Sequence, residues 1–167
     1  MKGIFNIFIF LATTVCFSQN PEGFTEMCDQ TIKGTVPYAS IDDLKKMSES
    51  NQVFILDTRE VEEYQVSHIK GAINVGYDDF NLNAMNGIPK DARIYVYCSI
   101  GYRSDDIGSR LIQAGYKNVF NVFGGIFSWF NHGYPLYNDK KQTDKIHGYN
   151  EEWSKWLNPA KGKIILK

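Results

Sequence analysis

Short apolar runs alternate with helix-like segments along most of this chain, and this alternation constrains the fold more than any other feature. Four runs are predicted as strands: residues 53–57, 71–75, 93–98 and 118–122. The run VFILD at 53–57 is continuously apolar and ends in an acid, as expected of a strand buried on both faces. Strands separated by helices predict an α/β fold, with a mostly parallel central sheet flanked by helices.

Helical spacing of apolar residues predicts the segments between these strands. Ile41, Leu44 and Met47 repeat at helical spacing after Ser40, which begins a weak capping box. Further helical segments are predicted at 60–65, at 80–85, from about Ser104 to Gly115, and between residues 124 and 133. With 167 residues, one domain with a sizeable core is expected.

The first eighteen residues have the layout of a secretory signal peptide: a lone Lys2, an apolar run to about Val15, and small residues before Gln19. The run is shorter than the roughly 20 residues of a membrane-spanning helix. We therefore predict cleavage near Ser18, an exported protein that is periplasmic or secreted, and no stable membrane span. Lipid anchoring at Cys16 is the less favoured alternative.

The remaining chain divides into three parts. We predict an N-terminal arm without a regular element at 19–39, a domain at 40–137, and a C-terminal extension at 138–167 with a short aromatic helix. In that helix Trp153, Trp156 and Leu157 share one stripe. We expect this stripe to pack back on the domain; a partner-binding helix is the alternative.

Charge and ligand spacing exclude several classes of function. The formal net charge is −1 and becomes −2 on loss of Lys2, which is the only charged residue before position 19, so no nucleic-acid partner is expected. The three histidines are far apart, no cysteine and histidine spacing matches a ligand set, and no phosphate-binding glycine loop occurs. We therefore expect neither a metal nor a cofactor.

The segment YVYCSIGYRSDD at 95–106 carries the chemistry. Cys98 ends the third predicted strand, and ligands of open α/β sheets lie beyond the carboxyl ends of the strands. Gly101 permits a positive φ, so that several amides can converge on an anion. A helix N-terminus and Arg103 favour the reactive thiolate form of Cys98. The carboxylates of Asp105 and Asp106 should oppose a strongly charged anion such as phosphate.

Three stretches resemble the rhodanese family. CSIGYRS resembles its active-site loop, LDTREVEEYQVSHIKGAINV its first conserved block, and GYKNVFNVFGGIFSWFNHGYPL its closing strand, double glycine and tryptophan helix. They cover about residues 40–136, in the expected order. The loop from Cys98 to Arg103 counts six residues, as in the family's sulfurtransferases and one fewer than in its phosphatase relatives.

This resemblance implies a three-layer rhodanese-like fold and a thiosulfate sulfurtransferase. Cys98 would take a sulfur from a donor such as thiosulfate, hold it as a persulfide, and pass it to cyanide or a thiol. The loop amides would stabilise the persulfide, and Arg103 would bind the donor's charged oxygens. The substrate-binding residues are then Ser99, Ile100, Gly101, Tyr102, Arg103 and Ser104. Asp57 and Arg59 would support the loop, and His68 is interpreted as structural.

Cys28 lies in the arm, outside the stretches that resemble the family. If it reaches Cys98, it could act as a resolving cysteine and form a disulfide. Two alternatives to the sulfurtransferase thus remain open. One is a thiol redox protein that cycles Cys98 with Cys28, and the other is a non-catalytic rhodanese-like interaction module that uses the aromatic tail helix.

Overall fold

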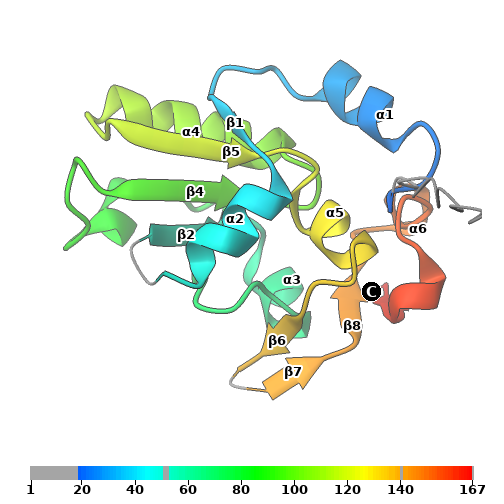
Figure 1. Ribbon diagram of the computed structural model, residues 1–167. Helices are drawn as coiled ribbons and strands as arrows, with labels where there is room; N and C mark the ends of the chain where they lie inside the picture. Colours follow the sequence, from blue (N-terminus) through cyan, green and yellow to red (C-terminus); the bar gives the residue numbers. More distant parts are fainter. Residues whose placement is uncertain (1–18, 51–52, 140, 167) are drawn as a thin grey trace, which may run out of the picture.

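A five-stranded parallel sheet in the order β1-β5-β4-β2-β3 forms the centre of the molecule in the computed structural model (Figure 1), which describes residues 19–50, 53–139 and 141–166. The elements around and within it are α1 (Phe24–Thr31), β1 (Tyr38–Ala39), α2 (Ile41–Ser48), β2 (Val53–Asp57), α3 (Val61–Val66), β3 (Ile73–Asn74), the 3₁₀ helix η1 (Leu82–Met85), β4 (Arg93–Tyr97), α4 (Tyr102–Gln113), β5 (Asn118–Val122) and α5 (Gly125–Asn131). The predicted α/β class is confirmed. The predicted signal peptide and Cys16 lie outside the described residues.

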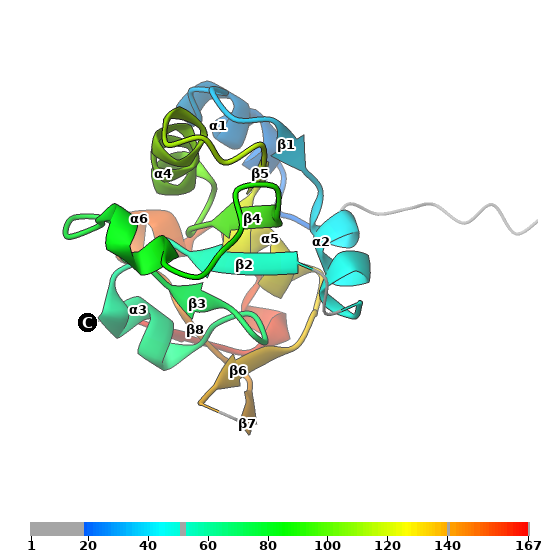
Figure 2. The ribbon, with the colours of Figure 1, turned by 90° about the vertical axis from the view of Figure 1, so that its left-hand side faces the viewer.

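Helices cover both faces of this sheet, which gives the three expected layers (Figure 2). The central strand β4 sends Ile94 and Val96 into one buried apolar cluster, and Tyr95 and Tyr97 into another. The first cluster is completed by α4 and η1, and the second by α2 and α5. Because side chains alternate along a strand, a strand with helices on both faces is apolar at successive positions, as β4 is from Ile94 to Tyr97.

Most predicted elements are confirmed, with shifted ends. Ser40 caps α2, and its hydroxyl accepts a hydrogen bond from the Asp43 amide at 3.0 Å. The strand predicted at 71–75 shortens to Ile73–Asn74 at the sheet edge, and the segment at 80–85 forms one 3₁₀ turn. The helix expected from Ser104 begins at Tyr102, because Gly101 already adopts the left-handed conformation that precedes it.

The prediction that the arm contains no regular element is wrong, because α1 occupies Phe24–Thr31. Phe24 and Cys28 lie one helical turn apart and are buried, and Ile32 continues the same face. This face packs on the core of the domain. In the sequence the short apolar stripe is hidden by its polar neighbours Thr25, Glu26 and Asp29 to Thr31.

The C-terminal extension folds back on the domain, as expected. It contains β7 (Lys141–Thr143), which forms a hairpin with β6 (Leu136–Asn138) at the end of the domain, the parallel pair of β8 (Lys145–His147) and β9 (Lys163–Ile165), α6 (Glu151–Ser154) and the 3₁₀ helix η2 (Pro159–Lys161). The helix α6 is shorter than predicted, so Trp156 and Leu157 follow it instead of sharing its stripe. Leu157 is buried, and the Trp156 ring meets Phe24 of α1 edge to face at 6.1 Å. The Asn131 side chain at the end of α5 donates to the carbonyl of Trp156 at 2.9 Å. No helix among the described residues is long and apolar enough to cross a membrane.

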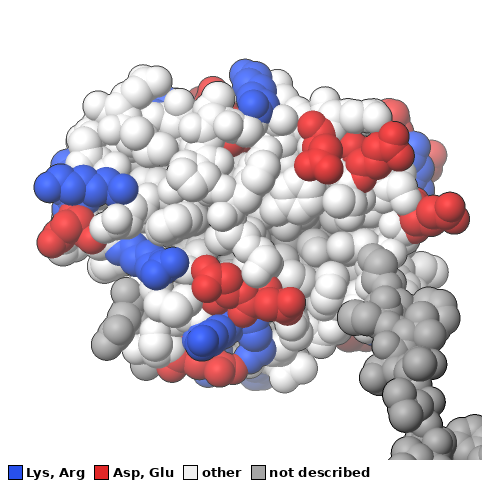
Figure 3. Space-filling view, turned by 45° about the horizontal axis from the view of Figure 1, so that its top comes forward, with Lys and Arg blue, Asp and Glu red and all other residues white. Residues whose placement is uncertain are grey.

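Charged side chains of both signs are spread over the face drawn in Figure 3. On the described part of the chain, ion pairs join Lys45 to Glu49 and Arg93 to Asp43 near the surface. The absence of a nucleic-acid partner stays a prediction.

Candidate active site

Cys98 is the first residue after β4, and α4 begins only four residues later. Gly101 makes this connection possible because its φ is +117°, a conformation that other residues rarely adopt. A Cβ at position 101 would also lie 2.8 Å from a methyl group of Ile32. The loop therefore turns sharply against α1 and directs the chain into α4.

The sulfur of Cys98 accepts a hydrogen bond from the Gly101 amide at 3.2 Å. Tyr102, Arg103 and Ser104 are the first residues of α4, so their amides have no intrahelical acceptor. The positive end of the helix dipole thus lies at the loop that carries the sulfur. This arrangement can stabilise a thiolate, or a negatively charged sulfur bound to it.

The amino end of α5 holds the start of the same loop. The Ile126 amide donates to the carbonyl of Cys98 at 2.9 Å, and the Phe127 amide donates to that of Ser99 at 3.0 Å. A Cβ at Gly125 would lie 2.3 Å from the Cys98 oxygen. The second glycine of the Gly124–Gly125 pair therefore permits the close approach of α5 to the loop.

Asn121 of β5 fixes the other end of the loop. Its amide group donates to the Gly101 carbonyl at 2.9 Å, and its oxygen accepts from the Ser104 hydroxyl at 2.8 Å. Ser104 is fully buried, so its side chain supports the loop instead of lining the pocket. Asp105 is also buried, and it accepts hydrogen bonds from the amides of Thr35 and Val36. Asp105 thus faces the arm and does not line the pocket, and its expected opposition to an incoming anion stays a prediction.

Arg103 forms a two-point ion pair with Glu63 of α3, at 2.7 and 2.9 Å. The Ser99 hydroxyl joins them, accepting from Arg103 at 3.1 Å. Burial by itself raises the pKa of Glu63, but the hydrogen bonds and charge of Arg103 outweigh burial, so this pKa lies below its usual value. The predicted substrate-binding arginine is thus already bound to an internal carboxylate.

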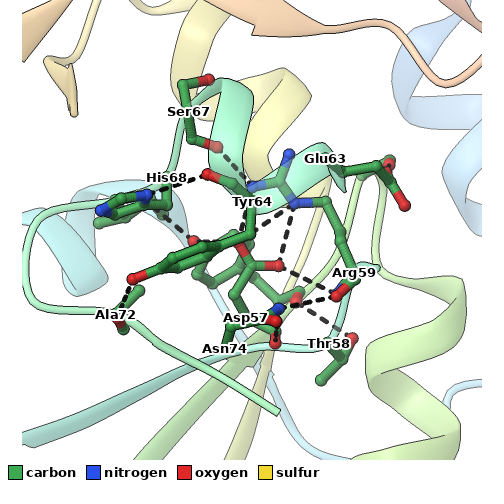
Figure 4. A network of polar contacts seen from close by, with 12 residues as sticks. Asp57, Thr58, Arg59, Glu63, Tyr64, Ser67, His68, Ala72 and Asn74 are labelled. Atoms are coloured by element: carbon green, nitrogen blue, oxygen red, sulfur yellow. Dashed lines mark hydrogen bonds and ion pairs between the residues drawn. The ribbon is translucent and has the colours of Figure 1, made fainter. Parts of the chain in front are cut away.

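Asp57 and Arg59 form a fully buried ion pair (Figure 4), and their support of the loop stays a prediction. The guanidinium donates to Asp57 through Nε at 2.9 Å and to the Ser67 carbonyl at 2.7 Å. Burial lowers the pKa of Arg59, yet the charge of Asp57 more than compensates, and the pKa is raised. The Tyr97 hydroxyl, at the end of β4, donates to Asp57 at 2.6 Å. This network ties β2 and α3 to the strand that carries Cys98.

His68 has a structural place, as interpreted from the sequence. Its Nδ1 lies 3.1 Å from the Tyr64 carbonyl oxygen, and its ring stacks on the Tyr64 ring at 3.9 Å (Figure 4). It does not line the pocket around Cys98.

A pocket of about 700 Å³ opens above Cys98. Its wall includes the predicted residues Ser99, Ile100, Tyr102 and Arg103, together with Thr31, Glu60, Glu62, Glu63, Tyr77, Asp78, His147, Tyr149, Asn150 and Trp153. The last four belong to the C-terminal extension. Their part in the site has no signal in the sequence, because they lie some fifty residues beyond the loop in a polar segment.

Cys28 lies against the back of the active-site loop, with its sulfur 3.9 Å from the Ile100 carbonyl oxygen. Both described cysteines are free. Burial raises the pKa of Cys28 to about 12, with smaller contributions from the charges of Cys98 and Asp29. At neutral pH the Cys28 thiol is therefore protonated and a poor nucleophile. Its role as a resolving cysteine stays a prediction.

Among the residues the structure describes, no group of three or more histidine, cysteine or acidic side chains is arranged to hold a metal ion. Glu63 and Asn121 are two further site residues that the sequence does not predict. Glu63 belongs to a run of polar residues that predicts an ordinary surface helix, and Asn121 sits inside a predicted strand. Neither position has a local pattern that marks it.

Comparison with known proteins agrees with this geometry. The family model of the rhodanese-like domain matches residues 40–132. A protein of Allochromatium vinosum named sulfurtransferase is 32% identical over 55% of this chain and 85% of its own length. A tRNA uridine(34) hydroxylase of Bdellovibrio bacteriovorus is 34% identical over 54% of this chain and 27% of its own.

A solved structure is also similar, the rhodanese-like domain of an Anabaena protein. It has a TM-score of 0.56 and 28% identity, over 61% of this chain and 79% of that one. The chain spans about half or less of the first two curated relatives. The matched region contains β2 to α5, Cys98 and the whole active-site loop. The chain belongs to the rhodanese-like domain family.

Proposed function

We propose that this protein transfers sulfur through a persulfide on Cys98. One observation carries the proposal: the Cys98 sulfur lies at the amino end of α4, accepts a hydrogen bond from the Gly101 amide, and borders an open pocket. Backbone amides that surround a sulfur atom can stabilise the negative charge of the outer persulfide sulfur without any side-chain base.

The reaction has two balanced steps. The Cys98 thiolate attacks the outer sulfur of the donor, a new S–S bond forms at Cys98, and the donor's S–S bond breaks. With thiosulfate as donor, sulfite leaves with the bonding electron pair. An acceptor thiolate or cyanide then attacks the outer sulfur, and Cys98 leaves as the thiolate.

Thiosulfate is the least supported part of this proposal. Arg103 would have to bind the donor's charged oxygens, yet its guanidinium is already held by Glu63 at two points. A dianionic donor would compete with this internal carboxylate. The redox alternative has less support than sulfur transfer, because burial keeps Cys28 protonated at neutral pH.

The test is the intact mass of the purified, reduced protein after exposure to thiosulfate or inorganic polysulfide, with Cys98→Ser in parallel. We expect a gain of one sulfur, about 32 Da, in the wild type alone, and its loss on adding cyanide. The same gain in Cys98→Ser would refute the assignment of the persulfide. A loss of two hydrogens that requires both Cys28 and Cys98 would support the redox alternative instead.

A further inference from the structure

The pocket above Cys98 is acidic, although a sulfurtransferase for thiosulfate would need to attract a dianion. Its lining contains four carboxylates, those of Glu60, Glu62, Glu63 and Asp78, and one guanidinium, that of Arg103, a formal balance of −3. The pocket holds the reactive cysteine, so its charge acts directly on whatever brings sulfur to Cys98 or removes it.

Three of the four carboxylates have no cationic partner within the described residues. Glu60 caps α3 and accepts from the Asp78 amide at 3.2 Å, which are contacts with backbone groups. Glu62 and Asp78 are exposed at the pocket rim. The ion pairs of the described chain involve none of the three. Lys33 lies nearby against the Tyr102 ring, at 5.7 Å, but is not part of the lining.

The guanidinium of Arg103 is the one positive group in the lining, and Glu63 and Tyr149 both restrict its contact with a substrate. Glu63 binds Arg103 at two points, and the Tyr149 ring covers its guanidinium, with 5.3 Å between Cζ and the ring centroid. Tyr77, Tyr102 and Trp153 add further aromatic side chains to the wall. Aromatic faces bind ammonium and guanidinium groups, as Tyr149 already does for Arg103.

We infer that the pocket selects a small thiol or persulfide that carries a positive charge beside its sulfur, and that it disfavours anionic sulfur compounds. This inference rests on the proposed function. In the acceptor step, the thiolate of such a compound attacks the outer sulfur of the Cys98 persulfide; a new S–S bond forms on the acceptor, the S–S bond at Cys98 breaks, and Cys98 leaves as the thiolate. The ammonium group would lie among Glu60, Glu62 and Asp78. A pocket of about 700 Å³ is within the range of small-molecule sites.

The experiment compares three acceptors of similar size: cysteamine, which is cationic, 2-mercaptoethanol, which is neutral, and 3-mercaptopropionate, which is anionic. Cys98 is first loaded with inorganic polysulfide, the added sulfur is verified by intact mass, and its loss to each acceptor is followed in single turnover. The same rates are measured for Glu62→Gln and Asp78→Asn, and for Glu49→Gln, which removes a glutamate outside the pocket. The preference is the ratio of the rates with cysteamine and with 3-mercaptopropionate. Dividing this ratio in each variant by the ratio in the wild type cancels the intrinsic reactivity of the thiols.

We expect each pocket variant to reduce the preference for cysteamine over 3-mercaptopropionate by about threefold to tenfold, since two exposed charges a few ångströms apart interact by roughly 1 kcal/mol. Glu49→Gln should leave it unchanged. In the wild type, added salt should slow sulfur transfer to cysteamine and accelerate transfer to 3-mercaptopropionate. An unchanged preference in both pocket variants, with Cys98 still loading, would overturn the inference alone. Failure of Cys98 to gain sulfur from polysulfide, from thiosulfate and from the cationic persulfide of cysteamine would overturn the proposed function, and the inference with it.

Discussion

Replacing Gly125 with alanine should damage the active-site loop far more than an ordinary glycine substitution. Gly125 has a φ of +51°, and its added Cβ would lie 2.3 Å from the Cys98 carbonyl oxygen and 2.7 Å from that of Ser99. Both neighbours are backbone atoms, so neither can swing aside as a flexible side chain would. The loop and α5 must therefore separate by about 1 Å to reach ordinary contact distance.

The free energy of unfolding should fall through two effects. The left-handed backbone costs a non-glycine residue about 1–2 kcal/mol. Separation also weakens the hydrogen bonds from Ile126 and Phe127 to the loop, at 2.9 and 3.0 Å, each worth about 0.5–1.5 kcal/mol and more if a buried group is left unsatisfied. Together these effects predict a loss of about 2–5 kcal/mol. Because Cys98 moves with its carbonyl, sulfur transfer should also fall by about 10²-fold.

The matched control is Gly115→Ala at the end of α4. Gly115 also has a positive φ, +92°, but its Cβ would meet nothing within 4 Å, so only the backbone cost of about 1–2 kcal/mol applies. Urea unfolding of both variants, with sulfur transfer measured on the folded protein, separates backbone strain from the clash. Equal losses of stability in the two variants, with full activity in Gly125→Ala, would refute this account of the loop.

Two further substitutions test the ionisable groups around the loop. Glu63→Gln removes the ion pair with Arg103 and should lower the free energy of unfolding at neutral pH by about 1.5–3 kcal/mol, while freeing Arg103 and lowering the KM for thiosulfate. Because the pKa of Glu63 is lowered on folding, this stabilisation is present above the unfolded pKa and is lost as the pH falls through the folded pKa. The free energies of unfolding of the wild type and Glu63→Gln should therefore become equal in acid. A difference between them that stays constant down to pH 3 would contradict a lowered pKa of Glu63. Since folding raises the pKa of Cys28 from 9.0 to about 12, stability should decline above pH 9, at up to about 1.4 kcal/mol per pH unit. Cys28→Ala should lack this part of the decline. If stability fell equally with pH in the two proteins, folding would not raise the pKa of Cys28.

Much of the fold and the centre of the site follow from the sequence, because they depend on neighbouring residues. A buried run followed by Cys98, Gly101 and a helix start specifies a tight loop with amides near the sulfur, since the loop is short and Gly101 allows its turn. The alternation of β4 between two faces likewise requires helices on both sides of the sheet. The sequence does not reveal α1, because its buried face has only two apolar positions, Phe24 and Cys28, within the helix.

The character of the pocket depends on tertiary structure alone. Glu63 and Arg103 are forty residues apart, and Cys28 is seventy-two residues from the carbonyl that it touches. Tyr149 reaches the site from an extension beyond the matched family region. No local pattern connects such positions. The sequence shows the charge of a side chain, but its partner depends on which elements pack together. The sequence by itself therefore determines the candidate sulfur at Cys98 and the short loop around it. Only the assembled fold decides whether Arg103 is available to bind a substrate or is already paired with Glu63.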